Sequence, residues 1–529
     1  MEILGLVNVP LWTLFLIAVL LLLYLYTSIN YGVFDKIGVK GPKPLPFVGN
    51  ILDIARKGFV ESESEWRQKY GRVFGIHEGH FPVLMICDVD ILKEITVKEF
   101  SNFTNRREFG LSKYARPPHS HFLTMQFDDE WRHNRNTQTP TFSGGKLKKM
   151  TSLINKAAES MIKAMKKAAY NSEPVDAKRY TGAYTMEVIA STAFGMDLDA
   201  QNTEDDPFVK YARKFFEFSI LDPMFLLVLI LPCFLPIIGA LKLPTLPQDA
   251  EKFFTKIVRQ ALAERRENPG KCSDFLEMMA NAEREAQASE QEGSHVTTGS
   301  KREENHENGD TAWVDKRKGK GLSDSEILAA CILFFSAGYD TTATTLTHAL
   351  YHLALNPDVQ DKLIDEIDEH FPPGKLPAYE TVGELQYLDM VIMEVLRINP
   401  PAARVDRVCK RDTEIRGLYI PAGTVVGLPI YTIHHDAEYW PDPDVFDPER
   451  FSPENKKTHH PLQWIPFGYG PRNCIGMRLA ILEMKLALIH LMKSFRFKTN
   501  SKTKPLKFGS TFLLTNTKDG VWVTPENRH

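Results

Sequence analysis

A glycine-rich bend with a single cysteine, residues 467–476, constrains this chain more than any other stretch. Gly468 and Gly470 let the backbone turn sharply and let a flat ligand approach it closely. Cys474 lies just before a long helical pattern, where unpaired backbone N–H groups and the helix dipole stabilise a thiolate and lower its pKa. One thiolate with no second ligand nearby suits a macrocycle that supplies its own nitrogens. Haem iron held by a cysteine thiolate fits that description.

This stretch, with the pattern F-x-x-G-x-R-x-C-x-G, resembles the haem-binding loop of the cytochrome P-450 family. The resemblance extends from about residue 42 to the C-terminus. It implies a mainly α-helical fold with small β-sheets (α+β), in which a long central helix lies over haem b, iron protoporphyrin IX. Cys474 would be the axial ligand of the haem iron, and Arg472 and Phe467 would contact the haem.

Three residues elsewhere match positions that bind haem propionates in the family. Residues 128–130 are acidic and favour a helix N-terminus. Trp131 and Arg135 follow, four residues apart, and would share one face of that helix. An indole N–H and a guanidinium can both donate to a carboxylate. The resemblance assigns this role to both side chains and to Arg407.

A second long pattern, residues 322–355, is apolar on most faces and predicts a buried helix. Ser323 can cap this helix, with Glu326 as its capping-box partner. Residues 337–342, A-G-Y-D-T-T, place a glycine, an acid and two threonines in its interior, which are poor occupants of a buried helix. A threonine hydroxyl that competes for an i−4 carbonyl can open the helix locally and admit water. The alternative is a polar kink whose hydrogen bonds are all satisfied.

These six residues resemble the A-G-x-[DE]-T-T motif of the family's long helix. By that match, Thr341 would organise the delivery of protons to dioxygen and Asp340 would support it. Positions that face the substrate in the family match Phe335, Ala337, Thr341, Ala402 and Leu513.

An acid and two arginines predict a structural contact that supports the cysteine loop. Glu394 and Arg397 lie three residues apart among apolar neighbours, so their charges are expected to be buried and paired. With Arg450 they match the family's E-R-R triad. The match implies a structural role that fixes the loop carrying Cys474, and not a catalytic one.

The N-terminus predicts a membrane anchor over residues 1–34. Residues 3–34 contain no charged side chain, and residues 11–26 are long and apolar enough to span the hydrocarbon core as a helix. Lysines follow at 36, 40 and 43, which by the positive-inside rule places the N-terminus in the lumen and the rest in the cytosol. We therefore expect a single-pass protein of the endoplasmic reticulum membrane. A cleaved signal peptide is the alternative, but Glu2 makes the first residues acidic and no A-x-A site follows.

Residues 35–50 are rich in proline and predict a semi-rigid hinge between this anchor and a catalytic domain over residues 51–529. A second uncharged run, residues 225–241, contains Pro232 and Pro236. We expect short helices there that dip into the membrane interface and border a lipid-fed access route. A second spanning helix is the alternative, but two prolines in a run of marginal length disfavour it.

The remaining segments allow a coarse prediction of secondary structure. Helices are expected over residues 52–70, 243–280, 386–400 and 477–491, strands over 404–431, and hairpins over 72–87 and 508–523. Residues 281–321 are polar with little apolar periodicity and predict a flexible loop. His434 and His435 lie in a polar stretch without a partner, and we expect both to be exposed.

Composition excludes several other classes of protein. The chain has 529 residues, a net charge of −3 and 43% hydrophobic residues, which is ordinary for a globular protein and gives no support for nucleic-acid binding. Its six cysteines are scattered without a C-x-x-C pair, which disfavours a disulfide framework or a zinc site. No glycine-rich nucleotide motif is present, so we expect NADPH and flavin to bind elsewhere.

The resemblance implies a monooxygenase that uses O2 and receives electrons from NADPH through the membrane-bound cytochrome P-450 reductase, possibly assisted by cytochrome b5. Residues 140–148, 221–223, 330–342 and 466–477 look like the vertebrate 3A subfamily, which implies apolar, steroid-like or xenobiotic-like substrates. An acidic partner could dock on basic residues that are equally well explained as solvated charge: Arg132, Lys146, Lys148 and Lys149.

Two other functions stay open at this point. The first is an isomerase that rearranges lipid peroxides without a reductase, against which the Asp340–Thr341 pair argues because such chemistry needs no proton delivery. The second is a membrane-tethered haem binder or gas sensor without turnover, in which that pair and the substrate positions would be idle.

Overall fold

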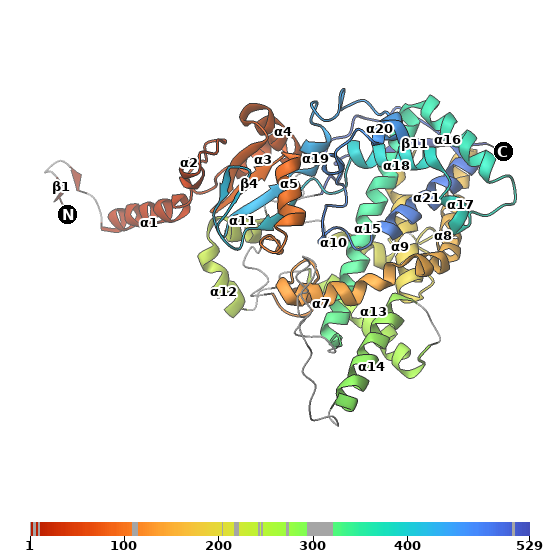
Figure 1. The fold of residues 1–529 in the computed structure, drawn as a ribbon, viewed down its shortest axis with the longest axis horizontal. Coiled ribbons are helices and arrows are strands. Elements are labelled where there is room, and N and C mark those ends of the chain that lie inside the picture. Colours follow the sequence, from red (N-terminus) through yellow and green to blue (C-terminus); the bar gives the residue numbers. More distant parts are fainter. Residues whose placement is uncertain are drawn as a thin grey trace, which may run out of the picture.

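A large helical region and a smaller sheet region lie side by side, and helix α1 (Leu11–Ser28) projects away from the sheet side (Figure 1). The long helix α15 (Asp324–Leu355) runs through the middle of the helical region (Figure 1). The structure is a computed structural model that describes residues 2–3, 7–8, 11–107, 115–203, 205–215, 222–241, 244, 247–270, 274–293, 321–509 and 514–528. This mainly helical architecture with small sheets confirms the predicted fold class.

The helices account for most of the chain. Between α1 and α15 they are α2 (Val33–Lys36), α3 (Ile51–Lys57), α4 (Phe59–Tyr70), α5 (Val89–Lys93), α7 (Asp128–Gln138), α8 (Gly144–Tyr170), α9 (Ala177–Phe194), α10 (Pro207–Lys214), α11 (Pro223–Ile230), α12 (Leu235–Ala240), α13 (Gln248–Glu267) and α14 (Phe275–Gly293). After α15 they are α16 (Pro357–His370), α17 (Tyr379–Val382), α18 (Gln386–Ile398), α19 (Ile430–His434), α20 (Pro453–Lys456) and α21 (Met477–Ser494). Short 3₁₀ or π segments lie at Glu94–Lys98, His119–His121, Thr139–Phe142, Pro232–Phe234, Pro448–Phe451 and Pro461–Gln463.

The largest described sheet has the strand order β3-β4-β9-β6. Its strands are β3 (Val73–Glu78), β4 (Phe81–Ile86), β9 (Val425–Leu428) and β6 (Val405–Val408). The second sheet contains β10 (Phe495–Lys498), β11 (Trp522–Asn527) and β5 (Val175–Asp176). Two hairpins complete the described strands: β7 (Thr413–Ile415) with β8 (Leu418–Ile420), and β1 (Glu2–Ile3) with β2 (Val7–Asn8). Strand β6 lies at the edge of the largest sheet, and Arg407 pairs there with Val426 of β9.

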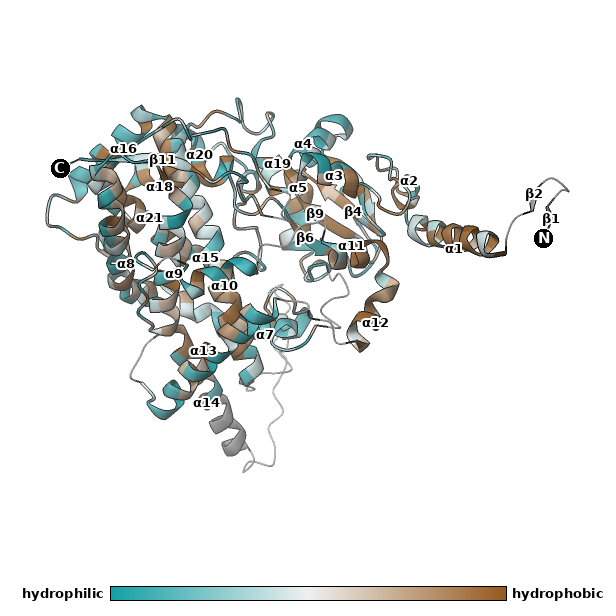
Figure 2. Ribbon diagram, turned by 180° about the vertical axis from the view of Figure 1, so that it is seen from behind, coloured by the Kyte–Doolittle hydropathy of each residue, from teal (hydrophilic) through white to brown (hydrophobic). Residues whose placement is uncertain are grey.

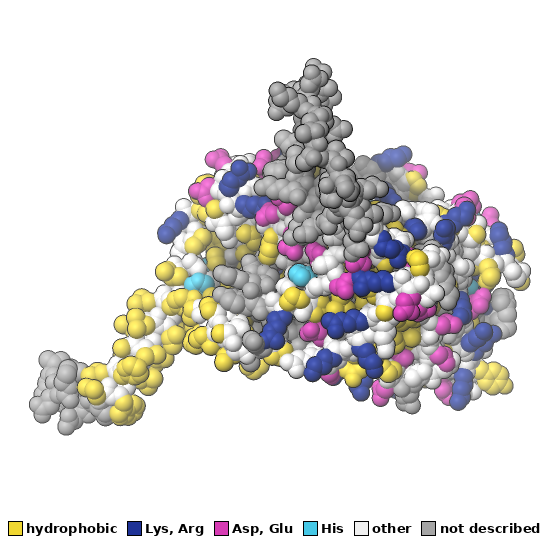
Figure 3. Space-filling model, turned by 90° about the horizontal axis from the view of Figure 1, so that it is seen from below, with side chains coloured by type: hydrophobic (Ala, Val, Ile, Leu, Met, Phe, Trp, Pro, Cys, Tyr) yellow, Lys and Arg dark blue, Asp and Glu magenta, His cyan; other side chains and the backbone are white. Residues whose placement is uncertain are grey.

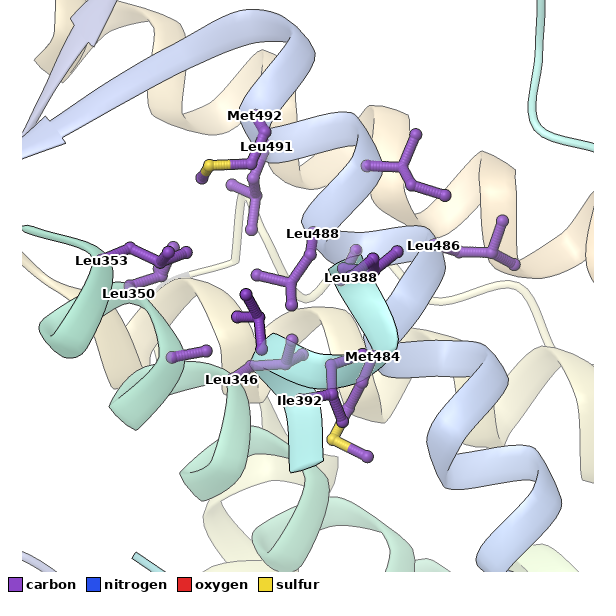
Figure 4. Packing of buried hydrophobic residues seen from close by; sticks show 14 of the residues in the cluster. Leu346, Leu350, Leu353, Leu388, Ile392, Met484, Leu486, Leu488, Leu491 and Met492 are labelled. Atoms are coloured by element: carbon purple, nitrogen blue, oxygen red, sulfur yellow. The ribbon is translucent and has the colours of Figure 1, made fainter. Parts of the chain in front are cut away.

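The main hydrophobic core lies where α15, α18 and α21 meet. Leu346 and Leu350 of α15 pack with Leu388 of α18 and Leu488 of α21, and all four side chains are buried (Figure 4). Each such side chain contributes roughly 1.5–3 kcal/mol by leaving water. Because α21 begins directly after the cysteine loop, this core holds the end of that loop in a fixed place.

Helix α15 begins as the sequence predicts. Ser323 and Glu326 form a capping box: the Ser323 side chain accepts from the Glu326 backbone N–H, and the Glu326 carboxylate accepts from Ser323 N at 2.9 Å. The helix is long and apolar enough to cross a membrane, but 72% of its apolar 18-residue stretch is buried inside the protein. It is therefore the central core helix.

Three of the secondary-structure predictions are wrong. The helix expected over residues 243–280 is divided, because α13 ends at Glu267 and α14 begins at Phe275. The helix expected over residues 52–70 is broken at Gly58, whose φ of 101° ends α3 and starts α4. The loop expected from residue 281 begins later, because α14 continues to Gly293. Residues 281–292 are mostly Ala, Glu, Gln and Arg, whose helix propensity suffices without an apolar stripe. The remainder of that predicted loop, 294–320, lies outside the described residues.

The apolar helix α1 fits a membrane span, with a mean hydropathy of 2.1 and 6% of its residues buried. Helices α11 and α12 lie below the largest sheet near the end of α1 and are apolar like α1 (Figure 2). They form a pair bent by 106° at Pro232, which agrees with the short helices predicted there. By length and composition alone, the pair could also be one broken span. Met224, Phe234, Ile237 and Leu241 expose apolar surface along this pair.

Candidate functional site

The cysteine loop is held in a tight bend by its own backbone. Gly470 has a φ of 79°, and a Cβ atom added there would lie 2.1 Å from the Thr96 carbonyl oxygen. The backbone N–H of Cys474 donates to the Phe467 carbonyl at 2.8 Å, which closes the bend. Helix α21 starts three residues after the cysteine. The glycine at 470 is therefore required both by conformation and by close contact.

The thiol of Cys474 lies in surroundings that disfavour its charged form. Its side chain is accessible, yet desolvation by the surrounding protein raises its pKa. The backbone N–H groups of Gly476 and Met477 and the charges of Arg135 and Arg106 oppose that rise. The side chain is therefore free to contact a group other than protein, and a cationic iron bound to it would add the charge that stabilises the thiolate.

Three arginines converge beside the loop with little negative charge to balance them. Burial first, and repulsion between the guanidinium groups second, lower the pKa of Arg472 to about 8 and that of Arg407 to about 9. The pKa of Arg106 is also lowered by burial. Asp406 partly offsets the charge on each of them. Such a cluster is costly unless anions bind in it.

Two of these arginines retain buried nitrogen atoms without a partner among the described residues, the Nε atoms of Arg106 and Arg407. Buried donors of this kind are rare in folded proteins and mark a place for a ligand or water. The two propionates of haem would supply the missing acceptors and the missing negative charge. The residues present therefore fit haem.

Arg106 is a residue that the sequence analysis missed. It belongs to no motif quoted there, and it precedes Arg107, which is buried. Two adjacent arginines after the apolar Phe103 were the only available signal. Their different roles depend on the fold: Arg107 forms an ion pair with Glu78 at 2.7 Å, whereas Arg106 joins the cluster beside the loop.

The other predicted haem contacts are brought to the same place but make protein contacts as well. Arg135 donates to the Asn473 carbonyl and to its side chain, both at 2.9 Å. Arg472 donates to the carbonyls of Thr104 and Gln126, both at 2.6 Å, and its guanidinium lies 4.8 Å from the centre of the Trp131 ring. These bonds fasten the cysteine loop to the chain before and within α7.

Most of α15 is buried, and part of the surface that stays accessible is a stripe along one face. Leu333, Ala337 and Thr341, spaced four residues apart, all retain accessible surface. Thr341 Oγ1 donates to the Ala337 carbonyl at 2.8 Å, which is the competing bond that the sequence analysis expected. A Cβ atom at Gly338 would lie 2.8 Å from Ile189 Cδ1, the end of a flexible side chain, so a larger residue there would displace Ile189.

Asp340 lies in a buried polar cluster on a different side of the helix. Its Oδ1 forms an ion pair with Lys178 Nζ at 2.8 Å, and its Oδ2 accepts from Asn516 Nδ2 at 3.1 Å. Lys178 Nζ also donates to Asn516 Oδ1 at 2.8 Å and to Thr344 Oγ1 at 3.1 Å. Both carboxylate oxygens are therefore engaged away from Thr341.

One predicted pocket residue is wrong. The ring of Phe335 is fully buried and stacks on Phe194 at 4.0 Å, with Phe254 at 4.9 Å. Each step along a helix turns by about 100°, so Phe335 points well away from the stripe of Ala337 and Thr341. Ala402 is partly accessible and forms a β-bridge with Leu514. Leu513 lies outside the described residues.

The three members of the structural triad meet as predicted. Arg397 donates to both oxygens of Glu394, at 2.6 and 2.8 Å, and Arg450 approaches Glu394 at 3.5 Å. Glu394 and Arg397 are completely buried. Burial raises the pKa of Glu394 and Arg397 opposes that rise. The pair therefore stabilises the fold only while both charges are present.

His434 connects this triad to the cysteine loop, and its predicted exposure is wrong. The side chain is completely buried, with Nδ1 at 3.1 Å from the Arg397 carbonyl. Its Nε2 accepts from the Ile465 backbone N–H at 2.9 Å, two residues before Phe467. Arg397 in turn donates to the His434 carbonyl at 2.9 Å. His435 is partly buried and stacks on Tyr431 at 3.9 Å.

We expect Arg106→Met to weaken haem binding. Loss of one charge-assisted hydrogen bond costs about 1.5–3 kcal/mol, which corresponds to roughly 10- to 100-fold faster haem loss if association is unchanged. Transfer of haem to apomyoglobin measures this rate. Arg416→Met, which removes an arginine that is half exposed, is the matched control. Equal rates for the two variants would contradict the role of Arg106.

Comparison with known proteins agrees over nearly the whole chain. A sequence profile of the family described as Cytochrome P450 matches residues 39–523. Cytochrome P450 3A9 of Rattus norvegicus is 41% identical over 506 residues, which covers 95% of this chain and 94% of that protein. Cytochrome P450 3A13 of Mus musculus is 41% identical over 499 residues, covering 94% and 92%. Cytochrome P450 3A12 of Canis lupus familiaris is 40% identical over 506 residues, covering 95% and 94%.

Proposed function

Because this chain belongs to the cytochrome P450 family, and is therefore a haem-thiolate monooxygenase, we propose specific roles for the residues of the site. Cys474 would bind the iron of haem b through its thiolate. Arg106, Arg407, Arg135, Arg472 and Trp131 would bind the propionates, and Phe467 would contact the haem. The observation that carries this assignment is the cluster of guanidinium groups beside an accessible thiol, in which Arg106 and Arg407 each keep a buried Nε atom without a partner in the described part of the chain.

Haem bound in this site supplies the activation of O2, with electrons that come from NADPH through the reductase. One oxygen atom enters an apolar, steroid-like or xenobiotic-like molecule and the other is reduced to water. The contribution of the chain is to hold the thiolate and to neutralise the propionates. Ala337, Thr341 and Ala402, with Leu513, are the residues that we propose contact the substrate.

Thr341 is the residue that we propose moves a proton into the site. Its hydroxyl is bonded to the Ala337 carbonyl, and rotation away from that carbonyl frees the proton for the space beside α15. The freed carbonyl can then hold a water molecule, which refills the relay. Asp340 supports the relay indirectly, because its ion pair with Lys178 and its hydrogen bond from Asn516 hold this turn of the helix in place.

We expect Thr341→Ala to retain haem and to consume NADPH while releasing hydrogen peroxide in place of product. General acid–base groups contribute about 10²–10⁴-fold, so product formation should fall by about 10²-fold. The measurement is the ratio of product to NADPH consumed in the presence of reductase. Thr345→Ala is the control, since Thr345 makes the same kind of bond to the Thr341 carbonyl at 2.9 Å but is buried. Unchanged coupling in Thr341→Ala would contradict the role.

The membrane topology is the second part of this proposal. The helix α1 crosses the endoplasmic reticulum membrane once, the N-terminus is luminal and the catalytic domain is cytosolic. Helices α11 and α12 insert their exposed apolar side chains into the same membrane surface. Protection of the N-terminus, but not of the C-terminus, from protease in sealed microsomes is the expected result, and the reverse pattern would contradict it.

The electron donor is expected on the face that carries Cys474. Lys148 and Lys149 are exposed at the start of α8, and Lys148 is paired with Glu380. With Lys146 and Arg132 they form a basic surface that suits an acidic partner. We propose that the reductase, and cytochrome b5 as a second donor, dock there.

A further inference from the structure

The end of the anchor helix is bonded to the turn between β3 and β4. The ring of Tyr26 stacks on His80, with centroids 4.9 Å apart and planes 13° from parallel. Two residues beyond α1, Asn30 places its Nδ2 atom 3.1 Å from both the backbone oxygen and the Nε2 of His80. The anchor therefore contacts the catalytic domain through specific side chains.

These distances define the hydrogen bonds. The backbone oxygen of His80 can only accept, so the Asn30 atom beside it is the amide nitrogen. An amide nitrogen can only donate, so a hydrogen bond from Asn30 to Nε2 requires a neutral imidazole with its proton on Nδ1. Burial lowers the pKa of His80, which favours the neutral ring, and a hydrogen bond with the Tyr26 backbone opposes that fall.

The same turn holds α11. The backbone N–H of His80 donates to the Leu229 carbonyl at 2.8 Å. Gly79 has a φ of 61°, and a Cβ there would lie 2.3 Å from the same carbonyl. Leu229 is completely buried in the core beneath the sheet. One turn of the sheet thus contacts both α1 and the helix that leads into α12.

The proline-rich segment that follows the anchor is also fastened to the domain. Phe34 is buried against Gly75, and Gly75 N–H donates to the Lys40 carbonyl at 3.0 Å. The Tyr31 hydroxyl donates to the Leu45 carbonyl at 2.9 Å and accepts from Gly49 N–H at 3.1 Å. These contacts hold the segment at several points, in addition to the stiffness that its prolines predict.

Apolar side chains continue from α1 onto the adjoining surface of the catalytic domain (Figure 3). We propose that His80 joins α1 and the α11–α12 pair into one rigid surface that contacts the lipid bilayer. On this proposal the joint, and not the proline-rich segment, sets the tilt of the haem relative to the membrane. The inference rests on the membrane contact proposed above for α11 and α12.

The test is the linear dichroism of haem absorbance for the full-length holoenzyme in oriented phosphatidylcholine bilayers. For the wild type we expect a dichroic ratio far from the isotropic value. In His80→Ala and Asn30→Ala the ratio should be closer to the isotropic value. His80→Gln should keep part of the ratio, because its Oε1 can accept from Asn30. Replacement of Pro42, Pro44 and Pro46 by alanine should leave it unchanged. An unaltered carbon monoxide spectrum of each variant shows that the haem site is intact.

A ratio that is unchanged in both His80→Ala and Asn30→Ala, or one that the triple proline variant alone alters, would overturn the joint. A second measurement tests the membrane contact separately. A nitroxide on Ile237→Cys, with Cys233→Ser, should be relaxed by oxygen more than by a water-soluble nickel chelate. The opposite preference would contradict the contact of α12 with lipid. It would not contradict the joint, which the dichroism alone tests.

Discussion

Replacement of Cys474 by serine is expected to abolish the thiolate-type spectrum of the haem and all NADPH-dependent product formation. A neutral serine hydroxyl cannot replace the electron-rich thiolate that favours O–O cleavage. The cluster of arginines stays in place in this variant, so some haem should still bind, with an altered ligand. Absorbance and electron paramagnetic resonance of the purified protein measure the ligation directly.

The matched control is Cys233→Ser, which makes the same substitution at another accessible cysteine. It should retain both the spectrum and the activity, since Cys233 lies between α11 and α12 and away from the loop. A thiolate-type spectrum that survives in Cys474→Ser would rule Cys474 out as the ligand.

Arg397→Met is expected to have the largest effect on stability. Removal of one partner from a buried ion pair costs about 3–5 kcal/mol, because it leaves an uncompensated buried charge. Here the residual charge is Glu394, which is fully buried and also accepts from the Asp447 backbone N–H at 3.0 Å. The loss should also loosen the loop, since Arg397 reaches the loop through His434. Thermal unfolding together with haem content measures both effects.

Two further variants make this prediction specific. Arg416→Met removes a surface ion pair with Asp90 and should cost at most about 1 kcal/mol. The double variant Glu394→Leu with Arg397→Met should recover part of the loss, because no buried charge remains. A single Arg397→Met variant as stable as Arg416→Met would contradict the account of the triad.

Sequence patterns with strong local signals predicted their elements well. The capping box at Ser323, the apolar run of α1 and the paired charges Glu394 and Arg397 all appear in the structure as expected. Each signal depends on neighbours within a few residues. Such patterns are preserved whatever the rest of the chain does.

The predictions that failed concern burial and side-chain direction, which depend on residues far away in the sequence. His434 is polar and locally unremarkable, but the Arg397 carbonyl and the Ile465 N–H give it partners in the interior. The helix that contains Phe335 was predicted correctly, but the direction of the Phe335 side chain was not. Each residue along a helix turns the side chain by about 100°, so a shift of one residue moves it to another face. Arg106 gains its place only when the chain before α7 folds against the cysteine loop.

The proline-rich segment gives the same lesson for domain organisation. Its composition predicts a semi-rigid spacer, but does not reveal that the Lys40 carbonyl accepts from Gly75 N–H of β3 or that Leu45 and Gly49 bond to Tyr31. The charge of the site is similar: no sequence pattern reports that Arg106, Arg407 and Arg472 approach one another. That repulsion is the physical reason why the site fits a ligand with two carboxylates.

The most direct test of the central claim is the absorbance of the dithionite-reduced, purified wild-type protein before and after addition of carbon monoxide. A cysteine thiolate opposite carbon monoxide gives the family's characteristic red-shifted band, and we predict that band at full haem occupancy. A spectrum of the kind given by histidine-ligated haem, or the absence of a carbon monoxide complex, would contradict ligation of the haem iron by Cys474.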